Sequence, residues 1–315
     1  MSIARSNFGE RLHALRLALQ AGIIVSKAPV EKDHNARARL FRNGLAVTSF
    51  AIIEDFIKAR IGEILNRLGG GMKPFSELPD GIKMAATSGV IYAVRFQERF
   101  LDKRNSNFFS FHQDHAQAIA STATVGGGYV ISPLAFGHGQ SNITSIEVKD
   151  ILSAFGVENP WQSMGQISSK VNVGVVDLKS SFDTASIRRN EAAHRADAEI
   201  EITDLEGFVT VMLGITIGFD LLISKALRKI LDYDRDYLSS RTKIRSGDIS
   251  IRFIHHDRNA GWREVVDQSA RAKARSLKLD TLKPACLQRA IANHQSVVIT
   301  GERSLPVDWY TPETD

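Results

Sequence analysis

The feature that most constrains the fold is a long periodic segment between Ala36 and Leu68. Its repeating positions follow steps of three and four residues: Phe41, Leu45, Thr48, Ile52, Phe56, Ile57, Ile61, Ile64, Leu65 and Leu68. This period is that of an α-helix, so the segment predicts one long amphipathic helix. Gly69-Gly70-Gly71 ends it, with Pro74 shortly after. Such a helix must cover its apolar face, which favours a bundle of helices.

Further helices are predicted along the first three quarters of the chain, at Leu17–Ser26, Ile82–Leu101, Ser145–Phe155, from near Asp183 through Ala196, and at Leu205–Leu231. The last is the most apolar, and Thr203-Asp204-Leu205-Glu206 at its start has the pattern of a capping box. It carries Gly214 and Gly218, four residues apart, where another helix can approach closely. Residues 1–237 are therefore predicted to form a mainly α antiparallel bundle.

The stretch from Asn105 to Ile146 has a different character. Its only formally charged residue is Asp114, and it contains five glycines. So few charges and so many glycines are typical neither of a helix nor of a solvated loop. We expect a long inserted loop region with short strands, for example at Tyr129–Ser132, lying over the helices. Long insertions of this kind tend to be functional or mobile.

Beyond a boundary near Leu238 to Ser246 the pattern changes to that of a small α+β appendage, residues 238–315. Two strands are predicted in it, at Asp248–Ile254 and at Ser296–Thr300. The first alternates apolar and polar residues, as a half-buried strand does. Between the two strands, Trp262–Leu279 is predicted to be a helix.

Positive charge is concentrated in this appendage. The net charge of the chain is +5, and Arg241–Arg289 contains twelve Lys and Arg against five Asp and Glu. Such a concentration indicates a polyanionic partner such as RNA or DNA. A solvated basic surface without a partner is the alternative. Arg271, Arg275 and Lys278, which stack on one side of the predicted helix, are the candidate RNA contacts.

The composition excludes several classes of protein. Hydrophobic residues at 43% and charged residues at 24% are ordinary for a globular chain and exclude collagen and bulk disorder. A single cysteine, Cys286, excludes a disulfide scaffold and any CxxC pair, so a reducing, cytoplasmic location is expected. The longest uncharged apolar stretch in a helical context, Gly207–Phe219, is shorter than the ~20 residues of a membrane span, so no membrane is expected.

One motif carries candidate chemistry, in the string Arg188-Arg189-Asn190-Glu191-Ala192-Ala193-His194. Arg189 and His194 form an R-x4-H pair. The spacing alone is weak evidence, because the chain has a second such pair, Arg289 and His294. The surroundings of each pair must therefore decide between them.

The surroundings of the first pair resemble the HEPN superfamily of helical-bundle ribonucleases, in particular the branch called RiboL-PSP-HEPN. Asn190 stands where that family has a polar residue, and Ala192 and Ala193 are the small residues before the histidine. The long apolar helix follows, as in the family. The second pair has Ala290 in place of the polar residue and no long helix after it.

The resemblance covers roughly Ala36 to Leu231. Ile52-Ile53-Glu54-Asp55-Phe56 resembles the family's early helix with an acidic residue, and Ser141–Thr144 leading into Val148–Leu152 resembles its segment before the motif. Ala196 departs from the subclass paired with nucleotidyltransferase antitoxins, which has a tyrosine two residues after the histidine. Regulation by modification of that tyrosine is therefore not expected.

The resemblance implies a metal-independent endoribonuclease without a cofactor. RNA supplies its own nucleophile, the 2′-hydroxyl, so the products would be a 2′,3′-cyclic phosphate and a 5′-hydroxyl. In this scheme His194 transfers protons. Arg189 binds phosphate oxygens and offsets the charge of the transition state. Asn190 supports them through hydrogen bonds, and Arg188 is an additional phosphate contact.

The geometry of the motif adds a condition. Five residues along an ideal helix leave Arg189 and His194 about 140° apart around the axis. Either the motif straddles a helix end, or groups from two chains complete the site. The resemblance implies the second: a homodimer with a composite active site. It also implies a prokaryotic toxin-antitoxin or antiviral defence system, with a possible antitoxin or defence-system partner protein.

Other groups give weaker predictions. His112-Gln113-Asp114-His115 with His138 could bind a metal, but their place in a glycine-rich region favours a polar rim over an RNA cleft. Gly126-Gly127-Gly128 lacks the lysine and the Ser/Thr of a P-loop. His255-His256-Asp257 is predicted to be a surface turn that follows a strand, with phosphate contact as the alternative. Cys286 is predicted to be a buried structural thiol.

Two other functions remain in competition with the ribonuclease. A non-catalytic HEPN module that binds nucleic acid or scaffolds a defence complex would carry the same basic appendage. A DNA-binding regulator would need a helix-turn-helix, and the sequence contains no convincing one.

Overall fold

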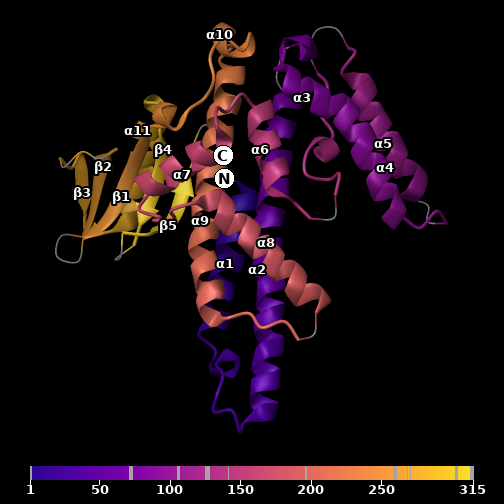
Figure 1. The fold of residues 1–315 in the computed structure, drawn as a ribbon. Coiled ribbons are helices and arrows are strands. Elements are labelled where there is room, and N and C mark those ends of the chain that lie inside the picture. The colour runs from indigo at the N-terminus through magenta and orange to yellow at the C-terminus, as the bar shows by residue number, and fades with distance from the viewer. Residues whose placement is uncertain are drawn as a thin grey trace.

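The computed structural model describes residues 2–70, 74–104, 107–124, 128–140, 142–195, 197–257, 261–267, 269, 271–301 and 304–312. Parts of the sequence predictions fall outside these ranges: Gly71, Asn105, Gly126, Gly127, Ser141 and Ala196. The described chain is mainly helical and has a small mixed sheet near its C-terminal end, as predicted (Figure 1).

Three long helices form the centre of the bundle (Figure 1). They are α1 (Ile3–Leu19), α2 (Lys32–Gly69) and α9 (Ile202–Leu231). α2 confirms the long helix predicted from the periodic segment. Its apolar face is buried from Phe50 to Leu68, whereas Phe41 near its start is exposed. The rings of Phe8 and Phe56 lie 5.3 Å apart where α1 packs against it. The predicted helix at Leu17–Ser26 is wrong, because α1 ends at Leu19 and a 3-10 turn follows at Gly22–Ile24.

α9 begins three residues before its predicted start. Its N-cap is Glu201, whose side chain makes no capping hydrogen bond. Thr203 therefore lies inside the helix, and the capping box predicted there is wrong. A capping box is formed instead by Thr144 and Glu147 at the start of α6 (Ser145–Ala154). α6 confirms the predicted short helix, and Gly156 follows it with a φ of 67°.

Gly214 and Gly218 bring α9 close to α7 (Pro160–Lys170). A Cβ atom at Gly214 would lie 2.7 Å from Oγ of Ser168, and one at Gly218 would lie 3.0 Å from Cα of Met164. The close helix approach predicted at these glycines is confirmed. The helix that makes the approach was not predicted, because its sequence carries few apolar residues.

α9 is also long and apolar enough to cross a membrane, with a mean hydropathy of 1.9 over its most apolar window. However, 89% of that window is buried inside the protein. Burial of this extent is what the core helix of a soluble protein shows.

A helical arm extends from one side of the bundle (Figure 1). The predicted helix at Ile82–Leu101 is present as α3 (Asp80–Met84), a π-helical turn (Ala85–Gly89), α4 (Val90–Gln97) and a 3-10 turn (Glu98–Phe100). The inserted loop predicted after it is wrong in part, because α5 (Asn107–Ser121) packs against α4. The exposed surface of α5 carries a single formal charge, Asp114, beside Gln113, Gln117 and the exposed Phe109, so the scarcity of charge did not indicate a loop.

The rest of the inserted region runs over the bundle, and none of its described residues pairs as a strand. Tyr129–Ser132, predicted to be a short strand, forms none. Tyr129 is buried, and its carbonyl oxygen would lie 2.7 Å from a Cβ atom on Gly69 at the end of α2. Glycine is required at this position because the inserted chain crosses the helix end there.

The C-terminal sheet has five strands in the order β3-β2-β1-β4-β5. Their bounds are β1 Ile251–Asp257, β2 Gly261–Val266, β3 Ala274–Ser276, β4 Ser296–Thr300 and β5 Pro306–Tyr310. β1 and β4 are parallel, and the other pairs are antiparallel. α11 (Leu279–Ala292) packs on one face. The other face contributes Phe253, Val265 and Trp309 to the core of the bundle.

The strand predictions are confirmed for β4, with the same bounds, and shifted for β1, which begins three residues later than predicted. The helix predicted at Trp262–Leu279 is wrong, because this segment forms β2 and β3. Arg271, Arg275 and Lys278 therefore share no helix face. Arg271 lies in the connection between β2 and β3, Arg275 is on β3, and Lys278 is the N-cap of α11.

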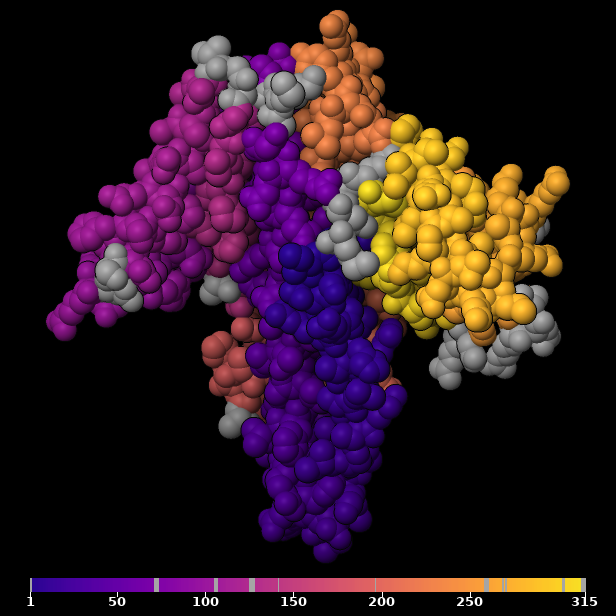
Figure 2. All heavy atoms as spheres, turned by 180° about the vertical axis from the view of Figure 1, so that it is seen from behind, coloured from indigo at the N-terminus to yellow at the C-terminus, as the bar shows by residue number. Residues whose placement is uncertain are grey.

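A buried charge cluster joins the sheet to the bundle. It consists of Arg5 on α1, Arg60 on α2 and Asp220 on α9, together with the C-terminal residues Trp309 and Thr311. Asp220 is fully buried, and its two oxygens accept from Nε of Arg60 at 2.6 Å and from the indole of Trp309 at 2.7 Å. Arg5 donates to the carbonyl of Trp309 at 2.9 Å. The first and last parts of the chain consequently lie side by side (Figure 2).

Opposed effects act on the carboxyl group of Asp220. Burial alone would raise its pKa, but the guanidinium groups of Arg60 and Arg5 outweigh burial and hold the pKa below its ordinary value. Asp220 is therefore an anion enclosed between two cations, and Arg60 also pairs with the partly exposed Glu63 at 2.8 Å.

Candidate active site

The motif lies on α8 (Leu178–His194), which begins five residues before the predicted helix. Asp177 caps its first turn by accepting from the backbone N–H of Ser180 at 3.0 Å. Leu178, Phe182 and Ala185 are buried, and the Phe182 ring lies 5.2 Å from that of Phe50 on α2. The N-terminal half of α8 is thus fixed to the core and holds the C-terminal half in place.

The residues Arg188 to His194 occupy the last two turns of α8. His194 is the final helical residue and Arg195 is the C-cap, so the whole motif is helical and does not straddle the helix end. Arg189 is half-buried, whereas Asn190 and His194 are exposed. Nη1 of Arg189 donates to Oδ1 of Asn190 at 3.1 Å. Asn190 and His194, four residues apart, share one face of the helix.

This placement decides what one chain can offer. Arg189 and His194 leave the helix in directions about 140° apart. A single copy therefore cannot direct both side chains at the same phosphate. Asn190 connects the two sides, because it bonds to Arg189 and lies one turn from His194. Among the described residues, His194 has no hydrogen-bond partner, so its imidazole can accept or donate a proton to a ligand.

Two buried polar residues fix the connection from α8 to α9. Nε of Arg42 donates to the carbonyl of Ile200 at 2.6 Å, and Nδ2 of Asn43 donates to the carbonyl of Ala198 at 2.9 Å. Both side chains are on α2, and Arg42 is only 6% exposed. The sequence analysis missed them. Their sequence spacing was the available signal. Arg42 precedes Ala46 by four residues, which places it on the buried face of the helix.

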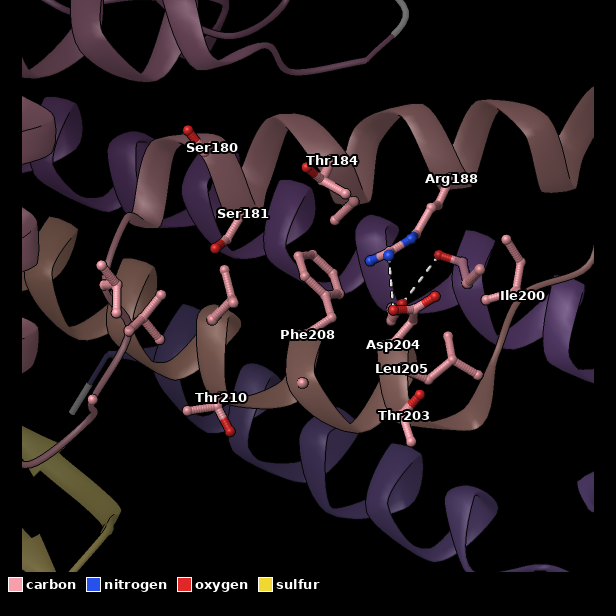
Figure 3. Close-up of a pocket in the computed structure, with 18 residues that line it drawn as sticks. Ser180, Ser181, Thr184, Arg188, Ile200, Thr203, Asp204, Leu205, Phe208 and Thr210 are labelled. Carbon is pink, nitrogen blue, oxygen red and sulfur yellow. Dashed lines mark hydrogen bonds and ion pairs between the residues drawn. The ribbon is translucent and has the colours of Figure 1, made fainter.

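Arg188 is not grouped with the motif. It points across a cavity of about 590 Å³ between α8 and α9, where its Nη2 lies 2.7 Å from Oδ1 of Asp204 (Figure 3). Ser181 and Thr184 of α8 form a polar wall of this cavity, and Phe208 of α9 contributes an apolar one. Arg188 was predicted to contact phosphate, but here its charge is paired with a carboxylate.

The three other predicted RNA contacts are also distant from the motif. The sheet that carries Arg275 lies on one side of α9, and the C-terminal end of α8 extends to the other side (Figure 1). Arg271 and Lys278 flank β3 in the chain and belong to the same appendage. The structure therefore separates the predicted cleavage residues from the predicted C-terminal RNA contacts.

The second R-x4-H pair is engaged elsewhere. Arg289 on α11 donates through Nε to Oε1 of the buried Glu264 at 3.0 Å, and His294 lies just after the helix with a φ of 57°. Cys286 on the same helix is fully buried, and burial raises its pKa to about 12. The prediction of a buried thiol is confirmed. His255-His256-Asp257 was predicted to be a turn, but these residues belong to β1.

Two histidines of the inserted region, His112 and His115, are on the arm, whereas His138 lies over the bundle beside α1 and α2. His112 and His115 belong to α5, and Nδ1 of His115 lies 2.9 Å from Oγ of Ser132. Within the described part of the chain, no group of three or more His, Cys, Asp or Glu has an arrangement that could hold a metal ion. The predicted polar rim is thus distant in the fold from the motif on α8 (Figure 1).

His138, in the inserted segment that runs over the bundle, makes the stability of the fold depend on pH. Burial, and then the charges of Lys58 and His115, lower its pKa from 6.5 to about 4. As the pH is lowered, His138 therefore binds a proton near pH 6.5 in the unfolded chain but only near pH 4 in the folded chain. Lowering the pH from 6.5 to 4 should consequently reduce the free energy of unfolding. We expect this reduction to be smaller in His138→Asn than in wild type, measured by urea denaturation at several pH values. Equal slopes in the two proteins would contradict this assignment.

The chain was compared with protein-family models, with curated proteins and with solved structures, and none of them matches it.

Proposed function

We propose that this protein is a metal-independent endoribonuclease of HEPN type, in which the helical bundle is a HEPN-like antiparallel bundle. One observation carries the proposal: the R-x4-H motif occupies the exposed end of a helix whose other half is anchored in the core. Asn190 and His194 share the accessible face there, and Arg189 is hydrogen-bonded to Asn190. This arrangement exposes a proton-transfer group on one side of the helix and holds a phosphate-binding group on the other, with Asn190 between them.

The reaction needs only proton transfer and charge stabilisation. A neutral imidazole of His194 removes the proton of the 2′-hydroxyl, whose oxygen attacks the adjacent phosphorus. The bond from phosphorus to the 5′-oxygen breaks, and a protonated imidazole supplies the proton of the new 5′-hydroxyl. Arg189 neutralises charge on the phosphate oxygens through paired N–H donors. The products are a 2′,3′-cyclic phosphate and a 5′-hydroxyl.

A homodimer with a composite active site supplies the second imidazole. Because Arg189 and His194 diverge on one helix, two copies of α8 facing each other would bring an arginine of one copy toward a histidine of the other. The accessible face of α8 also exposes Ile187, whose side chain is 60% exposed one turn before Asn190 and Glu191. An apolar side chain on this face favours its coverage by a partner.

We assign the protein to the cytoplasm, in a prokaryotic toxin-antitoxin or antiviral defence system with RNA as the substrate. The single, buried Cys286 is compatible with a reducing compartment. An antitoxin or another defence-system protein would be the natural partner, since free ribonuclease activity in a cell must be restrained. The alternative is a non-catalytic HEPN subunit that binds nucleic acid or scaffolds a defence complex.

The test is an RNA digest with the purified full chain. We expect cleavage of single-stranded RNA in the presence of EDTA, with cyclic phosphate ends identified by mass spectrometry. The matched control is the same sequence with 2′-O-methyl groups, which lacks the nucleophile and should remain intact. Cleavage of the methylated RNA, or loss of cleavage in EDTA, would refute the mechanism. Binding of RNA without cleavage would favour the non-catalytic alternative.

A further inference from the structure

A cationic cleft of about 350 Å³ lies where the C-terminal sheet meets the end of α7. Its polar lining comes from both parts of the protein: Lys170 and Asn172 from the end of α7, His255 from β1, Arg263 from β2 and Asp267 just after β2. This cleft belongs neither to the motif on α8 nor to the cavity that holds Arg188.

The strand register places basic side chains in a row across the sheet. Arg263 is directly opposite His255 on β1 and directly opposite Arg275 on β3. Residues opposite each other in antiparallel strands project from the same face, so these three side chains form one line. Adjacent strands are only about 4.8 Å apart. Two like charges in this relation destabilise a sheet unless an anion lies between or above them.

The two arginines form no ion pair within the described residues. Both side chains are exposed, and neither makes a hydrogen bond or ion pair with any residue that the structure describes. The carboxylate of Asp267 also lines the cleft and offsets part of its positive charge, but its hydrogen bonds come from neutral groups. Its Oδ1 accepts from the backbone N–H of Ile251 at 3.0 Å, and its Oδ2 accepts from Oγ of Ser250 at 3.2 Å.

The opposite face of the same sheet shows the contrast. There Arg252 donates to the buried Glu264 at 2.6 Å, and Arg289 of α11 donates to the same carboxylate at 3.0 Å. The two arginines on the α11 side thus share one carboxylate of the chain itself as their ion-pair partner. Those on the cleft side are left for a ligand.

Two other nitrogen-bearing side chains of the cleft, His255 and Lys170, are held in position. Nδ1 of His255 lies 2.7 Å from Oγ1 of Thr300, and its ring stacks on Phe253 with a centroid distance of 5.2 Å. Nζ of Lys170 donates to the carbonyl of Ser246 at 2.7 Å, which leaves two of its three N–H donors for a ligand. A site with ordered basic groups requires little rearrangement to bind an anion.

We propose that this cleft and the adjoining Arg275 bind consecutive phosphates of the RNA backbone, as a substrate-holding site separate from the cleavage motif. Guanidinium groups suit this task, because each can donate two hydrogen bonds to one phosphate. The identity of the ligand as RNA rests on the proposed function, whereas its class as a polyphosphate anion follows from the charges of the sheet. The site would hold the substrate by contacts that do not read its sequence.

The experiment measures RNA binding without cleavage. Full-length His194→Ala protein is titrated into fluorescently labelled single-stranded RNA at several salt concentrations. Adding Arg263→Ala and Arg275→Ala should raise Kd about tenfold or more. The slope of log Kd against log salt should fall by about 1.4, since each lost phosphate contact on a single strand contributes about 0.7. Arg263→Lys with Arg275→Lys should keep the salt slope and lose less affinity.

The matched control removes the same charge from the other side of the bundle. Lys103→Ala with Arg104→Ala alters two exposed cations between α4 and α5, on the arm opposite the sheet (Figure 1). This control should bind RNA as its parent does. Equal weakening in both double variants, unchanged binding in the sheet variant, or no binding by the parent would overturn the proposal. If binding depends on the cleft but the wild type cleaves no RNA, the ribonuclease proposal fails and the cleft assignment stands.

Discussion

His194→Ala is expected to lower the rate of RNA cleavage by about 10²- to 10⁴-fold, the usual contribution of a general acid or base. The fold should be preserved, because the side chain is exposed at the end of α8. Exposed substitutions of this kind change the free energy of unfolding by less than about 0.5 kcal/mol. Single-turnover cleavage measured on gels, with thermal unfolding beside it, tests both parts.

The second R-x4-H pair provides the matched control for this variant. His294→Ala removes the histidine of a pair whose arginine is bound to Glu264. It should cleave RNA at the wild-type rate. If His294→Ala lost activity while His194→Ala kept it, the site would have been assigned to the wrong pair.

Mixing of subunits tests whether the site is shared between copies. The inactive double variant Arg189→Ala, His194→Ala is mixed in equal amounts with wild type and allowed to exchange subunits. If both copies must be intact, activity should fall to about a quarter when copies pair at random, and to about a half if each copy acts alone. Activity proportional to the wild-type fraction would therefore exclude the composite site.

Asp220→Ala is expected to destabilise the protein by about 3–5 kcal/mol, the cost of leaving buried cations without their anion. Arg60 and Arg5 would keep their charges in the interior, where the partly exposed Glu63 beside Arg60 would offset them only in part. The indole N–H of Trp309 would also lose its acceptor. The free energy of unfolding from urea titration measures the effect.

Asp55→Ala serves as the control for the charge cluster. Asp55 accepts from Arg11 at 2.6 Å, but its side chain is 59% exposed. Exposed ion pairs contribute about 0–1 kcal/mol, so little change is expected. A loss below about 1 kcal/mol in Asp220→Ala, or an equal loss in both variants, would contradict the role assigned to the cluster.

The parts of the fold that were predicted are those with a long, regular pattern. α2 and α6 were found from helical periodicity, and β4 from a short β-branched run. α5 carries only one formal charge, Asp114, and α7 has few apolar residues, so the sequence patterns predict neither helix. In the segment that forms β2 and β3, Arg271, Arg275 and Lys278 follow helical steps, and this spacing wrongly predicts a helix.

The sequence predicted which helix carries the candidate motif, but not the side-chain contacts that hold this helix and its neighbours in place. The motif on one helix could be read from sequence, because it depends on local spacing. The ion pair of Arg188 with Asp204 could not, since α9 begins earlier than predicted and so directs Asp204 toward α8. The hydrogen bonds from Arg42 and Asn43 to the residues after the motif depend on tertiary packing, which no local pattern encodes.

The charge cluster also has a consequence for synthesis of the chain. Asp220, Arg60 and Arg5 are translated well before Trp309 and Thr311, which complete their hydrogen bonds. A nascent polypeptide therefore carries this ionic centre unfinished until Trp309 and Thr311 have left the ribosome. A chain truncated before Trp309 would leave the joint open to water and to proteases, so closure of the cluster requires β5 to have been translated.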